Sequence, residues 1–194
     1  MVAMTDARGI LPVDRPLTID DLDLLPDDGT RYELDDGLLV MSPSPAAGHQ
    51  RVVLRLAVLL EAACPPEFLV FPGLGVAVSR SQYRIPDIVV ADVADVAFDE
   101  HSVDGPPVLV VEVASPSTAL YDRNRKKEVY ARFGIESYWI VTPDPEKPVL
   151  TAFELRKGEY RQVAEVKGGD AFRAQRPFAC EIVPAELVAG PWRS

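Results

Sequence analysis

Two acidic residues in otherwise apolar segments constrain the fold of this chain more than any other feature. Asp87 follows Arg84-Ile85-Pro86 and precedes an apolar run, and Glu112 interrupts the apolar run from Val108 to Ser115. A lone ionised carboxylate in such a segment is costly to desolvate, so each acid needs a cation or a strong hydrogen-bond donor. If the two segments are neighbouring strands, both acids converge on one point. A divalent metal ion suits two hard oxygen ligands, so the pattern predicts metal-assisted hydrolysis.

Length and composition favour one domain. The chain has 194 residues, 47% of them hydrophobic, which is enough for a single buried core. We expect a mobile N-terminal arm over residues 1–16 and a single domain over 17–194. The apolar runs are short, so we expect no membrane span, no secretory signal and a cytoplasmic protein. Cys64 and Cys180 lie far apart, which argues against a zinc site or a disulfide framework.

The net charge limits how the chain can meet nucleic acid. It carries 20 basic and 30 acidic residues, a formal charge of -10, which opposes general attraction to a phosphate backbone. Any nucleic-acid contact must therefore be local. The one basic concentration consists of Arg123, Arg125, Lys126, Lys127 and Arg132. A solvated helix face is the simplest interpretation of that run.

Local patterns predict an α/β chain. Helices are expected from residue 18 to before Pro26, and at 49–63, 122–133 and 184–188. Strands are expected at 32–34, 38–41, 68–71, 75–78, 88–91, 108–114, 138–141, 149–155 and 160–166. We expect the four strands between residues 68 and 114 to form the core sheet. The order strand, helix, strand from 108 to 141 implies a right-handed parallel crossover.

Glu112 is the stronger of the two candidate functional acids. Side chains alternate along a strand, so Glu112 shares a face with Val110 and Ala114 in a run that is apolar on both faces. Glutamate is rarely buried without a partner, which favours a functional role over a structural ion pair. For Asp87, an aspartate after proline also suits a strand entry, where it would only cap a backbone amide.

Lys126 supplies a candidate third group. The helix residues that share one stripe with it are Asp122, Val129, Tyr130 and Phe133. Lys127 points away from this stripe. Because the helix directly follows the Glu112 strand, the Lys126 ammonium could reach the metal site. The alternative is an ion pair with Asp122 at i, i+4, with the lysine stem packed and its head at the surface.

An ordered series of motifs resembles the Uma-two family of endonucleases over residues 18–155. The matching residues are Tyr32-Glu33-Leu34, Asp36-Gly37, His49, Pro86-Asp87, Glu112-Val113-x-Ser115-Pro116-Ser117-Thr118, Asp122, Lys126, Tyr130, Gly134 and Tyr138-Trp139-Ile140-Val141. That family is assigned to the restriction-endonuclease-like PD-(D/E)XK superfamily. The resemblance therefore implies an α/β fold with a restriction-endonuclease-like core, in which a mixed central sheet is flanked by helices and carries extra β-hairpins.

The resemblance also assigns roles to residues. It implies Asp87 and Glu112 as metal ligands and Glu33 as an auxiliary acid. The superfamily's usual Glu-x-Lys is broken because Ala114 occupies the lysine position. The resemblance offers Lys126 as a migrated lysine, and the small Ala114 on the Glu112 face leaves space for a side chain arriving from the helix.

The expected mechanism uses Mg²⁺ or Mn²⁺ held by Asp87, Glu112 and the Val113 backbone carbonyl, with Glu33 as a further ligand. Such an ion polarises a phosphodiester oxygen and lowers the pKa of a bound water. Lys126 would orient that water or stabilise developing negative charge. Glu33 could instead form a surface pair with Arg31.

His49 and Tyr130 are auxiliary candidates. His49 begins a helix behind a Ser/Pro loop and could contact phosphate, although a local hydrogen bond at the helix start is the simpler interpretation. Tyr130 shares the stripe of Lys126.

These observations leave two functions open. The first is a metal-dependent endonuclease that hydrolyses phosphodiester bonds, with DNA as the substrate implied by the resemblance. The alternative is a catalytically reduced nuclease fold that serves as a DNA-binding or protein-interaction module, with Ala114 as the sign of lost activity. An exposed edge in the hairpin at 149–166 is compatible with a homodimer.

Overall fold

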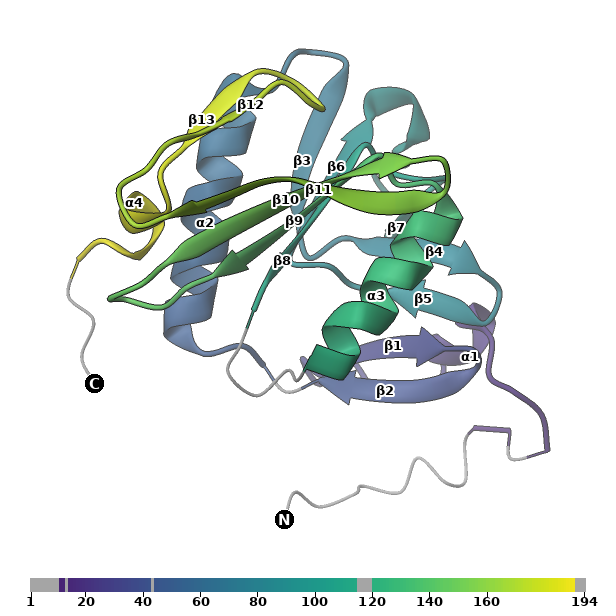
Figure 1. The fold of residues 1–194 in the computed structure, drawn as a ribbon. Helices are drawn as coiled ribbons and strands as arrows, with labels where there is room; N and C mark the ends of the chain where they lie inside the picture. The colour runs from purple at the N-terminus through teal and green to yellow at the C-terminus, as the bar shows by residue number, and fades with distance from the viewer. Residues whose placement is uncertain (1–10, 13, 43, 115–119, 191–194) are drawn as a thin grey trace.

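The computed structural model describes residues 11–190 apart from 13, 43 and 115–119. Most of the arm expected over residues 1–16 lies outside the described residues, and so does the Ser115–Thr118 part of the family motif. Figure 1 shows a central sheet with a helix on each side and a second, smaller sheet beside it. No helix in the described ranges is long and apolar enough to cross a membrane.

The central sheet is mixed, as predicted. Its six strands lie in the order β11-β10-β9-β8-β6-β3. Their bounds are β3 Phe68–Pro72, β6 Ile88–Asp92, β8 Leu109–Val113, β9 Ser137–Thr142, β10 Val149–Arg156 and β11 Glu159–Lys167. β8 and β9 run parallel, whereas the other neighbours run antiparallel. β11 is an edge strand of this sheet, and pairing of two copies along it stays a prediction.

A second sheet carries the first hairpin. Its order is β2-β1-β5-β4-β7. The bounds are β1 Arg31–Asp35, β2 Leu38–Ser42, β4 Gly75–Ser79, β5 Gln82–Arg84 and β7 Ser102–Val103. Asp36 and Gly37 both have positive φ, 50° and 80°, as a tight hairpin turn requires. The expectation that the strand at 75–78 belongs to the core sheet is wrong, because the chain turns at Gly73 (φ 70°) and β4 pairs with β5 and β7 instead.

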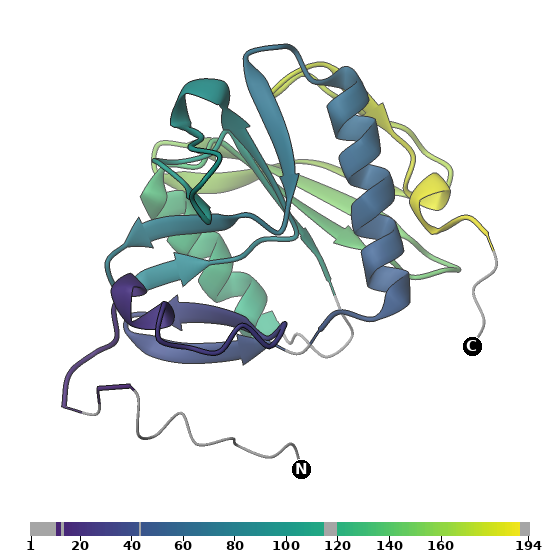
Figure 2. The same ribbon diagram turned by 180° about the vertical axis from the view of Figure 1, so that it is seen from behind.

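Helices α2 (Ala47–Ala63) and α3 (Leu120–Phe133) cover opposite faces of the central sheet, as the two views in Figures 1 and 2 show. α2 buries Val52, Leu56 and Leu60 against one face. α3 buries Val129 and Tyr130 against the other. This division decides the location of the site, because side chains on alternate strand positions face one helix or the other.

The ends of both helices follow their sequence signals. Cys64 is already extended where Pro65-Pro66 follows α2, and Gly134 adopts φ 94° just past the end of α3. The expected helix near residue 18 is shorter than predicted, since α1 spans only Ile19–Leu22, and α4 spans Pro184–Val188 as predicted. The sequence patterns did not predict the short strands β5, β7, β12 (Phe172–Ala174) and β13 (Cys180–Ile182).

Substitution of Gly75 tests how tightly the second sheet is packed. A Cβ at this position would lie 2.0 Å from the Tyr83 hydroxyl oxygen and 2.7 Å from the His101 carbonyl oxygen. We expect Gly75→Ala to lower the free energy of unfolding by about 2 kcal/mol, because the added atom overpacks a buried contact. Urea unfolding followed by circular dichroism measures this. Gly169→Ala is the matched control, since nothing lies within 4 Å of its Cβ position. Equal stability of the two variants would contradict the expectation.

Candidate active site

Asp87 and Glu112 lie at neighbouring strands of the central sheet. Asp87 directly precedes β6, and Glu112 lies on β8. β6 and β8 pair with Ile88 opposite Val111, so each acid lies one residue beyond this pair. Glu112 contacts α3 through Lys126, whereas Asp87 contacts α2 through His49. The charge of Asp87 raises the pKa of Glu112, so the structure brings the two predicted acids close together.

Asp87 is held by donors from three elements. Its Oδ2 accepts the backbone N–H of Val113 at 2.7 Å and lies 3.1 Å from His49 Nε2, and its Oδ1 lies 3.3 Å from Arg31 Nη1. Burial alone would raise the pKa of this carboxyl. The hydrogen bonds from His49 and Val113 and the charge of Arg31 outweigh burial, so the pKa of Asp87 lies below its ordinary value. These contacts therefore stabilise the ionised form of the carboxylate.

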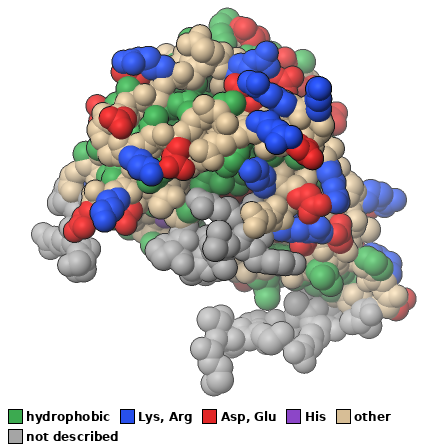
Figure 3. All heavy atoms as spheres, viewed as in Figure 1, with side chains coloured by type: hydrophobic (Ala, Val, Ile, Leu, Met, Phe, Trp, Pro, Cys, Tyr) green, Lys and Arg blue, Asp and Glu red, His purple; other side chains and the backbone are tan. Residues whose placement is uncertain are grey.

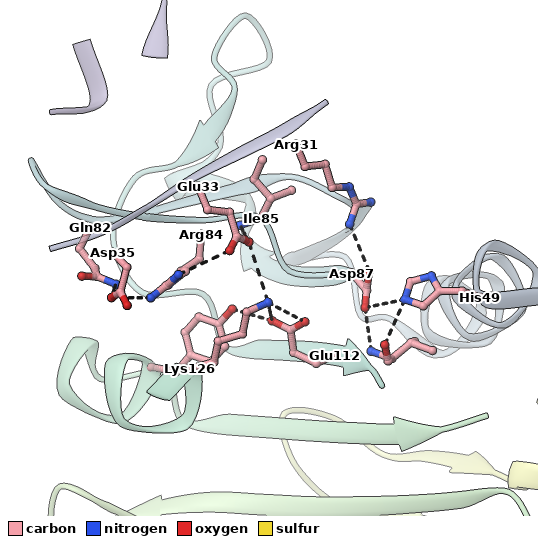
Figure 4. A network of polar contacts seen from close by, with 12 residues as sticks. Arg31, Glu33, Asp35, His49, Gln82, Arg84, Ile85, Asp87, Glu112 and Lys126 are labelled. Atoms are coloured by element: carbon pink, nitrogen blue, oxygen red, sulfur yellow. Dashed lines mark hydrogen bonds and ion pairs between the residues drawn. The ribbon is translucent and has the colours of Figure 1, made fainter. Parts of the chain in front are cut away.

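Glu112 meets two groups from α3. Its Oε1 accepts the Tyr130 hydroxyl at 2.7 Å, and Lys126 Nζ lies 3.2 Å from both carboxylate oxygens (Figure 4). Burial raises the pKa of Glu112 to about 7, the Lys126 charge opposes that rise, and the nearby carboxylates of Asp87 and Glu33 add to it. Burial is the main cause of this rise, so the ionised form of Glu112 depends on a nearby cation.

Glu33 belongs to the same cluster and is buried. From β1 it accepts the Ile85 backbone N–H at 2.8 Å, and it lies 3.5 Å from Arg84 Nη1 and 3.9 Å from Lys126 Nζ. The alternative that Glu33 forms a surface pair with Arg31 is wrong, because Arg31 contacts Asp87 instead. Lys126 thus lies between the carboxylates of Glu33 and Glu112.

His49 contacts residues of the site that its position in the sequence did not indicate. It lies in the first turn of α2, but its Nε2 contacts Asp87 and, at 3.0 Å, the carbonyl oxygen of Val113. The expected local hydrogen bond is therefore wrong. The Asp87 carboxylate and the Val113 carbonyl can only accept hydrogen bonds, so Nε2 carries the proton. The hydrogen bond to Asp87 raises the pKa of His49. The Nδ1 atom is buried with no hydrogen-bond partner among the described residues.

The basic run on α3 is divided between distinct contacts. Lys126 enters the acidic cluster as predicted, and the side chain of Asp122, its alternative partner, is outside the described part of the chain. Lys127 points elsewhere, as predicted, with its ammonium 3.7 Å from the centroid of the Phe153 ring. Arg125 pairs with Asp35 and with the turn residue that follows it. A solvated helix face therefore describes only part of this run.

Arg84 is a site residue that the sequence patterns missed. Its side chain is 2% exposed and lies 2.7 Å from Asp35 as well as close to Glu33. Asp35 also accepts from Gln82 and Arg125. Through Glu33 and Lys126 the same polar network reaches α3 (Figure 4). The sequence shows an arginine two residues before Pro86. The partners of Arg84, however, follow only from the pairing of β1 with β5.

The donor set suits a hard divalent cation in its chemistry. The Asp87 carboxylate and the Val113 carbonyl both contact His49 Nε2, and the Glu112 carboxylate comes from the residue before Val113; carboxylate and carbonyl oxygens are the ligands that such an ion prefers. Among the described residues, no three His, Cys, Asp or Glu side chains already form a metal-holding group. Arg31, His49 and Lys126 contact the acidic oxygens instead, so a bound ion would have to replace some of these contacts.

The chain matches the model of the Uma2 family, described as "Putative restriction endonuclease", over residues 19–186. It belongs to this family. A crystal structure described as a "putative nuclease belonging to DUF820" from Anabaena variabilis ATCC 29413 is similar, with a TM-score of 0.70 and 17% sequence identity. The match covers 89% of this chain and 98% of that chain. No curated protein matches the chain. The resemblance and the mixed α/β fold predicted from the sequence are confirmed.

The raised pKa of Glu112 predicts a pH dependence of stability. Its ordinary value is 4.5 and its folded value is about 7, so the protonated form stabilises the fold below 4.5 and this contribution is lost as the pH rises through 7. Between about pH 5 and about pH 8, with a chelator present, we expect the wild type to lose on the order of 3 kcal/mol more stability than Glu112→Gln.

Urea unfolding at several pH values measures that difference. Glu61→Gln, an exposed position on α2, is the control and should follow the wild type. Parallel profiles for the wild type and Glu112→Gln would contradict the expectation.

Proposed function

We propose that this protein is a metal-dependent endonuclease that hydrolyses phosphodiester bonds in DNA with Mg²⁺ or Mn²⁺. One observation carries the proposal: Asp87, directly before β6, lies close to Glu112 on the neighbouring strand β8, and the Lys126 ammonium lies 3.2 Å from Glu112. Two carboxylates and a neighbouring cation are the groups that metal-assisted hydrolysis needs. Membership of the family described as "Putative restriction endonuclease" supports the same reaction class.

Asp87, Glu112 and the Val113 carbonyl are the proposed ligands, with Glu33 next to them. When bound, the ion would polarise a phosphoryl oxygen and lower the pKa of a bound water. His49 keeps Asp87 and the Val113 carbonyl directed toward one point, because its Nε2 contacts both. Burial, and after it the charges of Asp87 and Glu33, raises the pKa of Glu112, so a cation beside the ionised carboxylate is favoured.

Lys126 is the proposed catalytic cation. Its ammonium lies between Glu112 and Glu33, so these carboxylates keep it charged and directed into the site. From there it would stabilise the negative charge that develops on the phosphoryl group or orient the attacking water. Tyr130 fixes one oxygen of Glu112 through its hydroxyl, and because Lys126 contacts both oxygens, an ion bound at Glu112 would have to share or replace the Lys126 contact. Ala114 leaves the usual lysine position without a cation, so Lys126 takes over that role.

If DNA is the substrate, a small part of the protein surface must attract its phosphate backbone. The net charge is -10, and Figure 3 shows basic and acidic side chains of the described residues interspersed over the face that carries α3. Phosphate recognition therefore has to come from cations at the site itself. The alternative function, a catalytically reduced module that binds DNA or protein, would use the same fold without needing the acids.

Substitution of the two acids tests the proposal. We expect Asp87→Asn and Glu112→Gln each to abolish plasmid nicking in Mn²⁺ and to weaken Mn²⁺ binding at least about tenfold, because each removes a charged ligand. Calorimetry measures the binding and gel electrophoresis measures the nicking. A catalytically reduced module predicts the opposite, with metal binding and nicking the same in the wild type and in both variants.

Lys126→Ala separates catalysis from metal binding. We expect nicking to fall by about a hundredfold or more while Mn²⁺ binding is retained, because the ammonium acts on the phosphoryl group. Lys147→Ala, in the exposed loop between β9 and β10, is the matched control. Lys127 is unsuitable as a control because it packs on Phe153. Undiminished nicking by Lys126→Ala would show that this lysine is not catalytic.

A further inference from the structure

Arg31 is the most accessible of the cations that contact the acidic cluster directly. Its side chain is 31% exposed, compared with 14% for Lys126 and 2% for Arg84. It meets Asp87 through one nitrogen, Nη1, at 3.3 Å, which is a long and single contact for a group that can bind carboxylates through two parallel hydrogen bonds. The mechanism described above does not use this residue.

The position of Arg31 complements that of Lys126. Figure 4 shows Arg31 reaching Asp87 from β1, while Lys126 reaches Glu112 from α3. Each acid of the pair therefore has its own cation, and the two cations lie on different sides of the pair. The second guanidinium nitrogen of Arg31 lies beside Gly73, 3.5 Å from where a Cβ would stand, so a glycine side of the backbone borders the guanidinium there.

We propose that Arg31 binds a phosphate of the substrate strand beside the bond that is cleaved. This inference rests on the proposed function. A phosphodiester that approaches Asp87, Glu112 and Glu33 is repelled by their charge, and a planar guanidinium matches phosphate geometry. When Asp87 shares its charge with a divalent ion, its attraction for Arg31 weakens. The guanidinium is then available to the substrate.

The test measures binding of a short fluorescein-labelled DNA duplex by anisotropy in Ca²⁺ over a range of salt concentrations. We expect Arg31→Gln to weaken binding about tenfold at low salt and to reduce the slope of log K against log salt by about one, because one phosphate contact is lost. Arg31→Lys should restore the salt slope but only part of the affinity for the duplex. Lysine keeps the positive charge but cannot form two parallel hydrogen bonds to one phosphate. Arg80→Gln, an exposed pair partner of Asp20, is the control for a lost surface charge and should match the wild type.

Two further measurements distinguish phosphate binding from support of Asp87. Mn²⁺ affinity of Arg31→Gln should be unchanged or tighter, because a competing cation is removed, and the KM for plasmid nicking should rise more than kcat falls. Weaker Mn²⁺ binding in this variant would show that Arg31 only holds Asp87 and would overturn the inference.

The outcomes also separate this inference from the proposed function. Wild-type affinity and salt slope in Arg31→Gln, with Mn²⁺-dependent nicking by the wild type, would overturn the role of Arg31 alone. A wild type that binds neither Mn²⁺ nor the duplex would overturn both.

Discussion

The register between β6 and β8 is the constraint on which the site depends. It brings Asp87, directly before β6, close to Glu112 on β8, in a sheet that α2 and α3 cover on both faces. Neither acid can be fully solvated there, so the surrounding elements must supply donors. The first hairpin supplies Arg31 and α3 supplies Lys126. The polar groups around the pair are therefore a consequence of where the sheet places Asp87 and Glu112.

The second sheet has a supporting role in this arrangement. Arg84 lies buried between Glu33 and Asp35, and Asp35 in turn accepts from Arg125 on α3. The network fixes the hairpin against the helix that carries Lys126. Removal of one partner from such a buried network leaves an uncompensated charge, which costs several kcal/mol in typical proteins. The position of Lys126, the proposed catalytic cation, thus depends on contacts made away from Asp87 and Glu112.

Local patterns in the sequence were sufficient for most elements and for the central pair of acids. Apolar strands with one carboxylate each, and a lysine on the buried stripe of α3, predicted the meeting of Asp87, Glu112 and Lys126. The role of His49 could not be predicted, because its partners come from strands far away in the sequence. Arg84 was missed for the same reason, and the short strand β5 that carries it has too few residues for a periodic signal. A sequence pattern indicates which residues of one helix or strand share a face, whereas the contacts of His49 and Arg84 join residues of separate elements.

The central claim is that Asp87 and Glu112 share one divalent ion. The most direct test is anomalous diffraction from crystals soaked in Mn²⁺ at a pH above 7, where Glu112 is ionised. The account predicts one manganese peak about 2 Å from oxygens of both carboxylates and of the Val113 carbonyl. The result that would contradict it is a map without a peak, in which Asp87 keeps its contacts with Arg31 and His49 and Glu112 keeps Lys126.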